Sequence, residues 1–266
     1  MTPTAYDDAG YHVETVTPRY APSVAPVTIW GLPLLPVSFA EAVGEVDRMI
    51  ETRRPGYFIT ANTHYAMLSD RDARLRQVNR DAAFLLADGM PMVWYSRGRR
   101  RRLPERVAGS DLIYALCGQA AKQGHRVFFL GGAPGVADAA ASRLCQLYPG
   151  LTIAGVEVPP FRTMTDDEHA RMLDRIRTAT PDLLFVALGQ PKGEMWIHEN
   201  YQSLGVPACV QLGASFDFVA GRVPRAPRWC QRLGVEWAYR IYREPRRMAP
   251  RYFQNALFLA KAVVRG

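Results

Sequence analysis

Residues 126–135 read RVFFLGGAPG, and this stretch decides the fold class. Its first half, up to residue 130, is an apolar run with the length and composition of a buried β-strand. Glycine and proline then form a turn, and the residues that follow, to about Leu147, have the apolar spacing of a helix. A strand, a tight glycine turn and a helix make up the unit from which parallel α/β sheets are built.

Residues 27–212 repeat this alternation of strand and helix patterns. The expected strands are 27–30, 56–61, 83–87, 126–130, 151–156, 183–188 and 208–212. The expected helices are 38–53, 63–70, one that starts at about 90, 110–123, 135–147, 166–178 and 191–201. Strands separated by helices of about 10–15 residues favour right-handed βαβ units. We therefore expect an α/β fold: a Rossmann-like, mostly parallel sheet with helices on both faces.

Composition divides the 266 residues into three expected parts: a flexible tail over 1–26, an α/β domain over 27–221 and a basic helical appendage over 222–266. The chain has a net charge of +8, yet the appendage alone holds eleven Lys/Arg and two Glu, so the rest is close to neutral. The N-terminus lacks the pattern of a signal peptide, and no apolar run reaches the roughly 18 residues of a membrane-spanning helix. Four widely spaced cysteines predict free thiols in a reducing cytosol.

The appendage combines its charge with a regular apolar pattern. Four residues recur at every fourth position and predict one stripe of a helix: Trp229, Leu233, Trp237 and Ile241. Arginines flank this stripe, and Pro245 and Pro250 are expected to interrupt or kink the path after it. Three interpretations stay open on the pattern alone, namely an ordinary packed helix, contact with an anionic membrane surface, and nucleic-acid binding.

Polar residues and glycines follow several of the expected strands at their carboxyl ends. They are Thr60 and Asn62, Asp88, the Gly131–Gly135 turn, and the Gly189–Lys192 segment. Ligands of open parallel sheets bind at this edge, so these residues are expected to gather on one rim. Asp88 ends an apolar strand and precedes Gly89. A half-desolvated carboxylate at that place suits a general base, but an N-cap of the next helix explains the pattern equally well.

The turn after residue 130 is a candidate phosphate site. Gly131, Gly132 and Gly135 allow a close backbone approach, and the following helix start offers free N–H groups and a positive dipole. The spacing is not that of the dinucleotide motif G-x-G-x-x-G, which also argues against a nicotinamide-dependent dehydrogenase. Phosphate binding and a plain tight turn are equal alternatives for this segment.

No metal site is expected. The histidines lack metal-ligand spacing, and the D-x-D triplet Asp70-Arg71-Asp72 falls between helical turns rather than at the end of a strand. We interpret the triplet as a solvated surface feature.

Several of these segments resemble the WecG/TagA/CpsF family of glycosyltransferases, and they occur in the order of the family's motifs. The matching stretches are TAN (60–62), LADGMPMVW (86–94), ERVAGSDL (105–112), FFLGG (128–132), VALGQPK (186–192), GASFDF (213–218), AG (220–221), RAPRW (225–229) and EPRR (244–247). Together they cover about residues 27–255, which is far more specific than any single motif.

The resemblance implies an inverting, metal-independent transferase that moves a sugar from a UDP-sugar to a polyprenyl-diphosphate-linked saccharide. The family's proposed general base falls on Asp88, and its other catalytic positions fall on Thr60, Asn62 and Arg106. Contacts with substrate are expected from matching motif residues and appendage arginines: Gly131, Gly132, Gly135, Gln190, Lys192, Asp217, Arg222, Arg225, Arg243, Arg246 and Arg247. No cofactor and no nucleic-acid partner is implied.

The resemblance also implies attachment of the appendage to the inner face of the plasma membrane, and thus a cytoplasmic, peripheral enzyme of cell-surface polysaccharide synthesis. The competing interpretation is a non-catalytic basic α/β protein that binds nucleotides or nucleic acid. One departure from the family pattern is evident: Gly193 stands where the family's P-K-Q-E motif has glutamine. A different donor or acceptor sugar, or substitution of that side chain by Gln190, would each account for the change.

Overall fold

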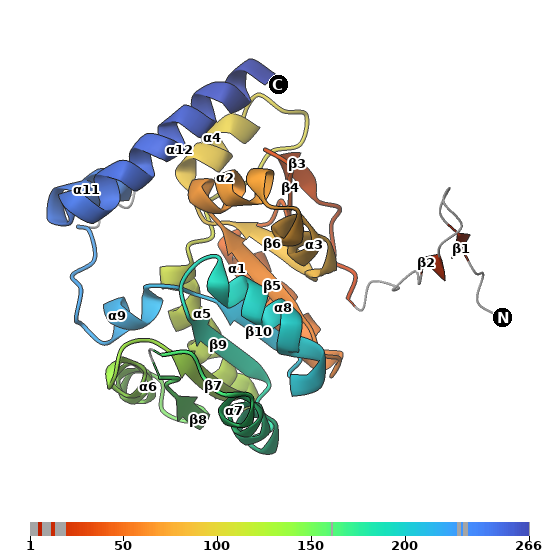
Figure 1. Ribbon diagram of the computed structural model, residues 1–266, viewed down its shortest axis with the longest axis vertical. Helices are drawn as coiled ribbons and strands as arrows, with labels where there is room; N and C mark the ends of the chain where they lie inside the picture. The colour runs from red at the N-terminus through yellow and green to blue at the C-terminus, as the bar shows by residue number, and fades with distance from the viewer. Residues whose placement is uncertain are drawn as a thin grey trace.

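The computed structural model describes residues 5–6, 12–13, 20–160, 162–227, 230 and 234–265. A mixed sheet, mostly parallel, forms the centre of the described chain (Figure 1). Its strands are β3 (Val27–Ile29), β4 (Leu32–Leu34), β5 (Tyr57–Ala61), β6 (Phe84–Ala87), β7 (Arg126–Gly131), β8 (Thr152–Glu157), β9 (Leu183–Ala187) and β10 (Ala208–Gln211). They lie in the order β3-β4-β6-β5-β10-β9-β7-β8, and only the β3–β4 pair is antiparallel. The expected fold class is confirmed.

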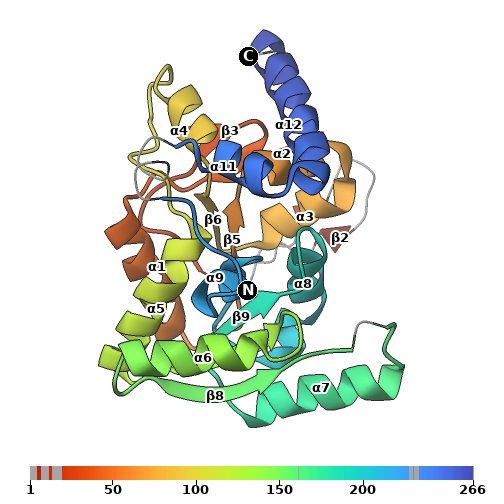
Figure 2. The same ribbon diagram turned by 90° about the vertical axis from the view of Figure 1, so that its left-hand side faces the viewer.

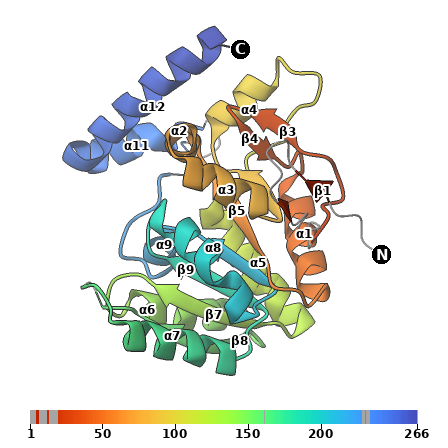
Figure 3. The ribbon, with the colours of Figure 1, turned by 45° about the vertical axis from the view of Figure 1, so that its right-hand side comes forward.

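Helices cover both faces of this sheet. One face carries α1 (Phe39–Glu51), α5 (Gly109–Gln123), α6 (Val136–Leu147) and α9 (Ser215–Val219). The other carries α2 (Thr63–Arg71), α3 (Ala73–Asp81), α4 (Met90–Ser96), α7 (Asp166–Thr178) and α8 (Lys192–Leu204), of which α3, α8 and α7 pack side by side (Figure 3). Neighbouring strand residues such as Phe128 and Phe129 are buried in opposite layers, because successive side chains of a strand point to opposite faces.

The helix starts follow local rules that the sequence carries. Ser38 and Glu41 form a reciprocal capping box at the start of α1, and Thr165 and Glu168 form another at α7. Each box satisfies two backbone N–H groups that would otherwise lack partners.

Elements that were not expected from the sequence include β4 and α3. The three residues of β4 include Pro33; a two-residue turn at Trp30-Gly31 connects β4 to β3, and β4 pairs with β6 in the sheet. The short α3 has only Leu75 and Val78 as buried apolar residues, and Asp72 caps its N-terminus. Both segments are too short or too polar for a periodic signal.

The appendage forms α11 (Glu236–Arg243) and α12 (Pro245–Arg265), and α12 lies against α2 (Figure 2). His64 of α2 hydrogen-bonds Asn255 at 3.2 Å, and Phe258 meets the Trp30 ring edge-on. The expected single stripe of 229–241 is wrong, because Gly234 adopts a left-handed turn at φ +71° before α11 begins. Trp229 and Leu233 lie outside the described residues.

The expected break at the two prolines is also wrong in part. Pro245 opens α12, where its missing N–H costs nothing, and the helix continues through Pro250. Among the described residues, no helix is both long enough and apolar enough to cross a membrane.

Described residues of the predicted N-terminal tail make contacts with α1. The Tyr20 hydroxyl donates to the backbone oxygen of Glu45 at 3.1 Å, and the Ser23 N–H donates to its carboxylate at 3.1 Å. The Glu45 side chain is fully buried under these groups. The pKa of Glu45 is lowered because these donors outweigh the cost of burial. All four cysteines are free, as expected.

Candidate active site

Five adjacent strands bring four residues predicted from the sequence, together with Gln211, to one edge of the sheet. In the order β6-β5-β10-β9-β7, the edge carries Asp88 after β6, Thr60 on β5, Gln211 on β10, Gln190 after β9 and Gly131 on β7. These are the carboxyl ends of parallel strands, where open α/β sheets bind ligands. The structure thus forms the rim that the alternation of strands and helices predicts.

Asp88 is half-buried directly after β6, and its side chain contacts the first residue of α5. Its Oδ2 accepts the backbone N–H of Gly109 at 3.2 Å, and its own N–H donates to the Ala61 carbonyl at 2.8 Å. The positive end of the α5 dipole favours the ionised carboxylate here. The N-cap of α4 is Gly89, which makes no side-chain cap, so the alternative of Asp88 as the α4 cap is wrong.

Gly109 brings Thr60 and Asp88 together. A Cβ built on this glycine would lie 3.4 Å from Thr60 Oγ1 and 3.6 Å from Asp88 Oδ2. The hydroxyl and the carboxylate therefore flank the same small space, which a larger residue would fill. Thr60 is buried, and its Oγ1 donates a long bond of 3.4 Å to the Gln211 carbonyl.

Asn62 has a structural task that accounts for its side-chain oxygen. It caps α2, and its Oδ1 accepts the Tyr65 N–H at 3.0 Å. Its backbone lies beside Gly89, since a Cβ at that glycine would be 3.9 Å from Asn62 Cα. The T-x-N and D-G segments are therefore neighbours.

An arginine from the appendage segment reaches the Asp88 region. Arg225 forms a two-pronged pair with Asp111 in the first turn of α5, with Nη2 2.7 Å from Oδ2. Burial by itself would lower the pKa of Arg225, but the carboxylates of Asp111, Glu236 and Asp88 raise it overall. The guanidinium thus lies within the electrostatic reach of the candidate base.

A second pair joins the appendage to the sheet edge. Arg106 Nη1 lies 3.2 Å from Glu236 Oε2, and the two side chains are only 17% and 11% exposed. Glu236 begins α11, whereas Arg106 precedes α5. Since the Glu236 carboxylate also raises the pKa of Arg225, as Asp88 does, the two ion pairs belong to one charge network that reaches Asp88 through Arg225.

The glycine turn after β7 meets a third arginine. Arg222 Nη2 donates to the Pro134 carbonyl at 3.1 Å, and it lies 3.9 Å from where a Gly135 Cβ would be. Packing alone also requires glycine at position 131. Gly131 has a φ of +99°, and a Cβ on it would lie 2.7 Å from the Ala187 carbonyl oxygen. Asp217 is half-buried, and its carbonyl accepts the Arg222 N–H at 3.0 Å.

Three predicted contact residues that the structure describes have no contact with this network that the structure shows. Lys192 at the start of α8 is exposed, as are Arg243 and Arg246 of the appendage. Arg247 belongs to α12, and its side chain lies outside the described part.

The departure at Gly193 has a structural counterpart. A Cβ at Gly193 would lie 2.0 Å from Oε1 of Gln211, whose side chain occupies that space. Gln190, in turn, donates from Nε2 to Glu194 Oε1 at 2.8 Å. Burial raises the pKa of Glu194 to about 7.

Comparison with known proteins places the chain in a family. A sequence model described as the glycosyl transferase WecG/TagA/CpsF family matches residues 27–266. The chain belongs to this family. It is similar to an N-acetylglucosaminyldiphosphoundecaprenol N-acetyl-beta-D-mannosaminyltransferase of Bacillus spizizenii, with 33% identity over 74% of this chain and 75% of the relative. The enzyme of the same name in Bacillus subtilis is 33% identical over 82% of this chain and 84% of its own.

The resemblance recognised in the sequence is therefore confirmed, and the protein is a glycosyltransferase. Membership of this enzyme family excludes the alternative of a non-catalytic basic binding protein.

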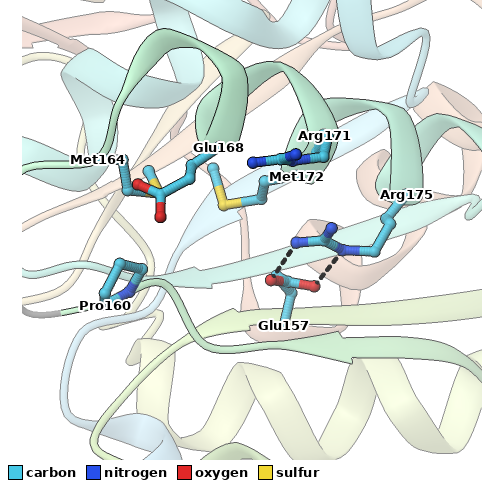
Figure 4. Close-up of a pocket in the computed structure, with 7 residues that line it drawn as sticks. All are labelled: Glu157, Pro160, Met164, Glu168, Arg171, Met172 and Arg175. Atoms are coloured by element: carbon cyan, nitrogen blue, oxygen red, sulfur yellow. Dashed lines mark hydrogen bonds and ion pairs between the residues drawn. The ribbon is translucent and has the colours of Figure 1, made fainter.

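The described residues of this glycosyltransferase contain no group of three or more His, Cys, Asp or Glu that is arranged to hold a metal ion. The D-x-D triplet has another use, since Asp72 caps α3 and pairs with Arg74 at 3.1 Å. A surface hollow of about 230 Å³ between β8 and α7 also holds carboxylates (Figure 4). Its Glu157 is engaged by the fork of Arg175 at 2.7 and 2.8 Å, and β8 is the edge strand beyond β7, outside the rim.

Sequence reasoning did not single out five residues of the site. They are Gly109, Asp111, Glu194, Gln211 and Glu236. Gly109 and Asp111 lie within the V-A-G-x-D motif, which was a usable signal. Glu236 and Gln211 act through contacts with residues distant in sequence, for which a single sequence offers no signal.

Proposed function

We propose that this enzyme transfers a sugar from a UDP-sugar to a saccharide linked to a polyprenyl diphosphate, with inversion at the anomeric carbon and without a metal ion. The placement of Asp88 beside Thr60, with Arg225 in electrostatic reach, carries the proposal. The two Bacillus relatives support the acceptor class, since both are named for a diphosphoundecaprenol acceptor.

In the proposed reaction, Asp88 takes the proton from an acceptor hydroxyl as the hydroxyl oxygen bonds to the anomeric carbon. The bond between that carbon and the UDP oxygen breaks, and UDP leaves with the bonding electrons. A positioned carboxylate accelerates such a step by about 10²–10⁴-fold. Thr60 Oγ1, on the other side of Gly109, is placed to orient the incoming hydroxyl.

Charge that develops on the leaving diphosphate needs cations or N–H donors. Arg222 above the Gly131–Gly135 turn and the start of α6 supply both in this chain. Arg225 supplies further positive charge within electrostatic reach of Asp88, and Arg106 is linked to this network through Glu236. This arrangement supports catalysis without a metal ion.

The exposed side of α12 supports attachment to an anionic membrane. Residues at helical spacing form an outward stripe: Arg246, Pro250, Phe253, Leu257 and Lys261. Phe253 and Leu257 are 66% and 50% exposed, and nearby Tyr242 and Trp237 of α11 are exposed as well. Apolar side chains between cations are typical of helices that lie in the interface of an anionic bilayer. We infer a peripheral enzyme at the cytoplasmic face, acting in cell-surface polysaccharide synthesis.

A transfer assay tests the proposal. The purified chain is mixed with a short-chain polyprenyl-diphosphate N-acetylglucosamine and with UDP-N-acetylmannosamine, its uronic acid or UDP-glucose in turn. We expect UDP release that depends on the acceptor, with an inverted anomeric centre in the product, and the same rate in excess EDTA. If no donor releases UDP, the transferase proposal is refuted. If EDTA abolishes activity and Mg²⁺ or Mn²⁺ restores it, the proposed metal-free step is refuted.

A further inference from the structure

Three side chains around the first turn of α8 each have one buried polar atom without a partner among the described residues. They are Gln190 with Oε1, Glu194 with Oε2 and Gln211 with Nε2. Glu194 and Gln211 are only 2% and 4% exposed. Leaving a polar group buried and unpaired is costly, so native proteins seldom keep such atoms together without a use.

The missing side chain at Gly193 and a backbone hydrogen bond determine how the Gln211 carboxamide is oriented. Because residue 193 has no side chain, the Gln211 side chain fills the space beside it, with Oε1 2.0 Å from where a Cβ would be. Oε1 accepts the Leu188 N–H at 3.2 Å, which directs Nε2 to the other side of the carboxamide. That nitrogen lies 3.9 Å from the Cβ position of Gly213, under the loop that follows β10.

The place of this cluster on the sheet indicates its ligand. Asp88 follows β6 and Thr60 lies on β5, whereas the glycine turn that Arg222 contacts follows β7. The cluster belongs to β10 and the β9 loop, which are between them. In a nucleotide-sugar donor, the transferred ring likewise lies between the attacking hydroxyl and the diphosphate.

We propose that Gln211, Glu194 and Gln190 form the subsite for the transferred sugar ring, and that the Gln211 amide determines which ring is accepted. This inference rests on the proposed transferase function. Ring hydroxyl and acylamino groups both donate and accept hydrogen bonds, so one ring satisfies the two free acceptors and the free donor. Gln190 is half-buried and follows the exposed Gly189. Its side chain would release its hydrogen bond to Glu194 when the sugar ring binds.

The test compares donors in Gln211→Met, which keeps the length of the side chain and removes the amide. Gln119→Met is the matched control, because Gln119 is a half-buried glutamine of α5 that bonds Asp47 at 2.6 Å outside this cluster. We expect kcat/KM for the preferred UDP-sugar to fall about ten- to hundredfold in Gln211→Met, with smaller losses for poor donors. The KM for the acceptor and the affinity for UDP alone should not change.

A second experiment tests the link between positions 193 and 211. Gly193→Gln alone should unfold at a lower temperature, because its Cβ collides with Gln211, and adding Gln211→Ala should restore the melting temperature. Unchanged donor ratios in a folded, active Gln211→Met, or equal melting temperatures for Gly193→Gln with and without Gln211→Ala, would overturn the inference. A wild-type chain that transfers no sugar from any donor would instead refute the proposed function.

Discussion

Replacing Asp88 with asparagine should abolish most turnover while leaving the fold intact. The Asn side chain retains an oxygen for the Gly109 N–H, which now lies 3.2 Å from Oδ2. Only the change from a charged to a neutral acceptor weakens that bond, by about 1 kcal/mol, so Tm should drop by about 2–4 °C. Loss of the proton acceptor costs about 10²–10⁴-fold in kcat, or about 3–5 kcal/mol in the barrier.

The assay measures acceptor-dependent UDP release together with UDP binding by calorimetry. UDP affinity should stay within a few-fold of wild type, because the change affects proton transfer rather than the diphosphate contacts. Asp72→Asn is the control, since Asn caps a helix as well as Asp and the residue lies on the exposed α3 start. An Asp88→Asn enzyme with near-normal turnover would refute the assignment of the base.

Three further outcomes follow from contacts described above. Glu236→Gln should break the ion pair with Arg106, which lowers the free energy of unfolding by about 2 kcal/mol and kcat/KM by about tenfold or more. Deuterium uptake in α11 should increase, and unchanged uptake would contradict this expectation. Burial raises the pKa of Glu194 from 4.5 to about 7 in the folded chain, so the free energy of unfolding of the wild type should fall as pH rises between these values. Glu194→Gln should lose this dependence, so that its stability relative to wild type, measured by urea unfolding, rises by roughly 3 kcal/mol from pH 4 to pH 8. Phe253→Glu with Leu257→Glu should weaken binding to anionic liposomes at least tenfold and spare transfer to a soluble acceptor, and equal binding by both proteins would exclude α12 as the membrane contact.

The sheet was predictable because its buried strands are apolar runs that alternate with helical patterns. The same reasoning located Thr60, Asp88 and Gly131 on one rim, since parallel strands end at a common edge. It failed at β4, whose three residues include a proline, and along 229–241, where Gly234 turns the chain. A pattern of spaced tryptophans does not reveal that a left-handed residue divides it.

The charge network of Arg106, Arg225 and their carboxylates was harder to predict from the sequence than the rim. Arg106 pairs with Glu236, which is 130 residues away in the sequence, and the residues around each one give no signal that predicts the pair. The exchange between Gly193 and Gln211 is similar, because a missing side chain is visible in the sequence but the group that fills its space is not. Such contacts are properties of the packed structure.

The dependence of the site on Arg225 and Glu236 has a consequence for synthesis of the protein. All strands of the central sheet precede Arg222, so the sheet can fold on the ribosome before the last segment emerges. Until that segment is released, Asp88 has neither Arg225 within reach nor Glu236 to hold Arg106. We therefore expect a chain that stops before Arg225 to form the sheet but to lack the charge network at Asp88, so that transfer activity would appear only after the appendage has folded against the sheet.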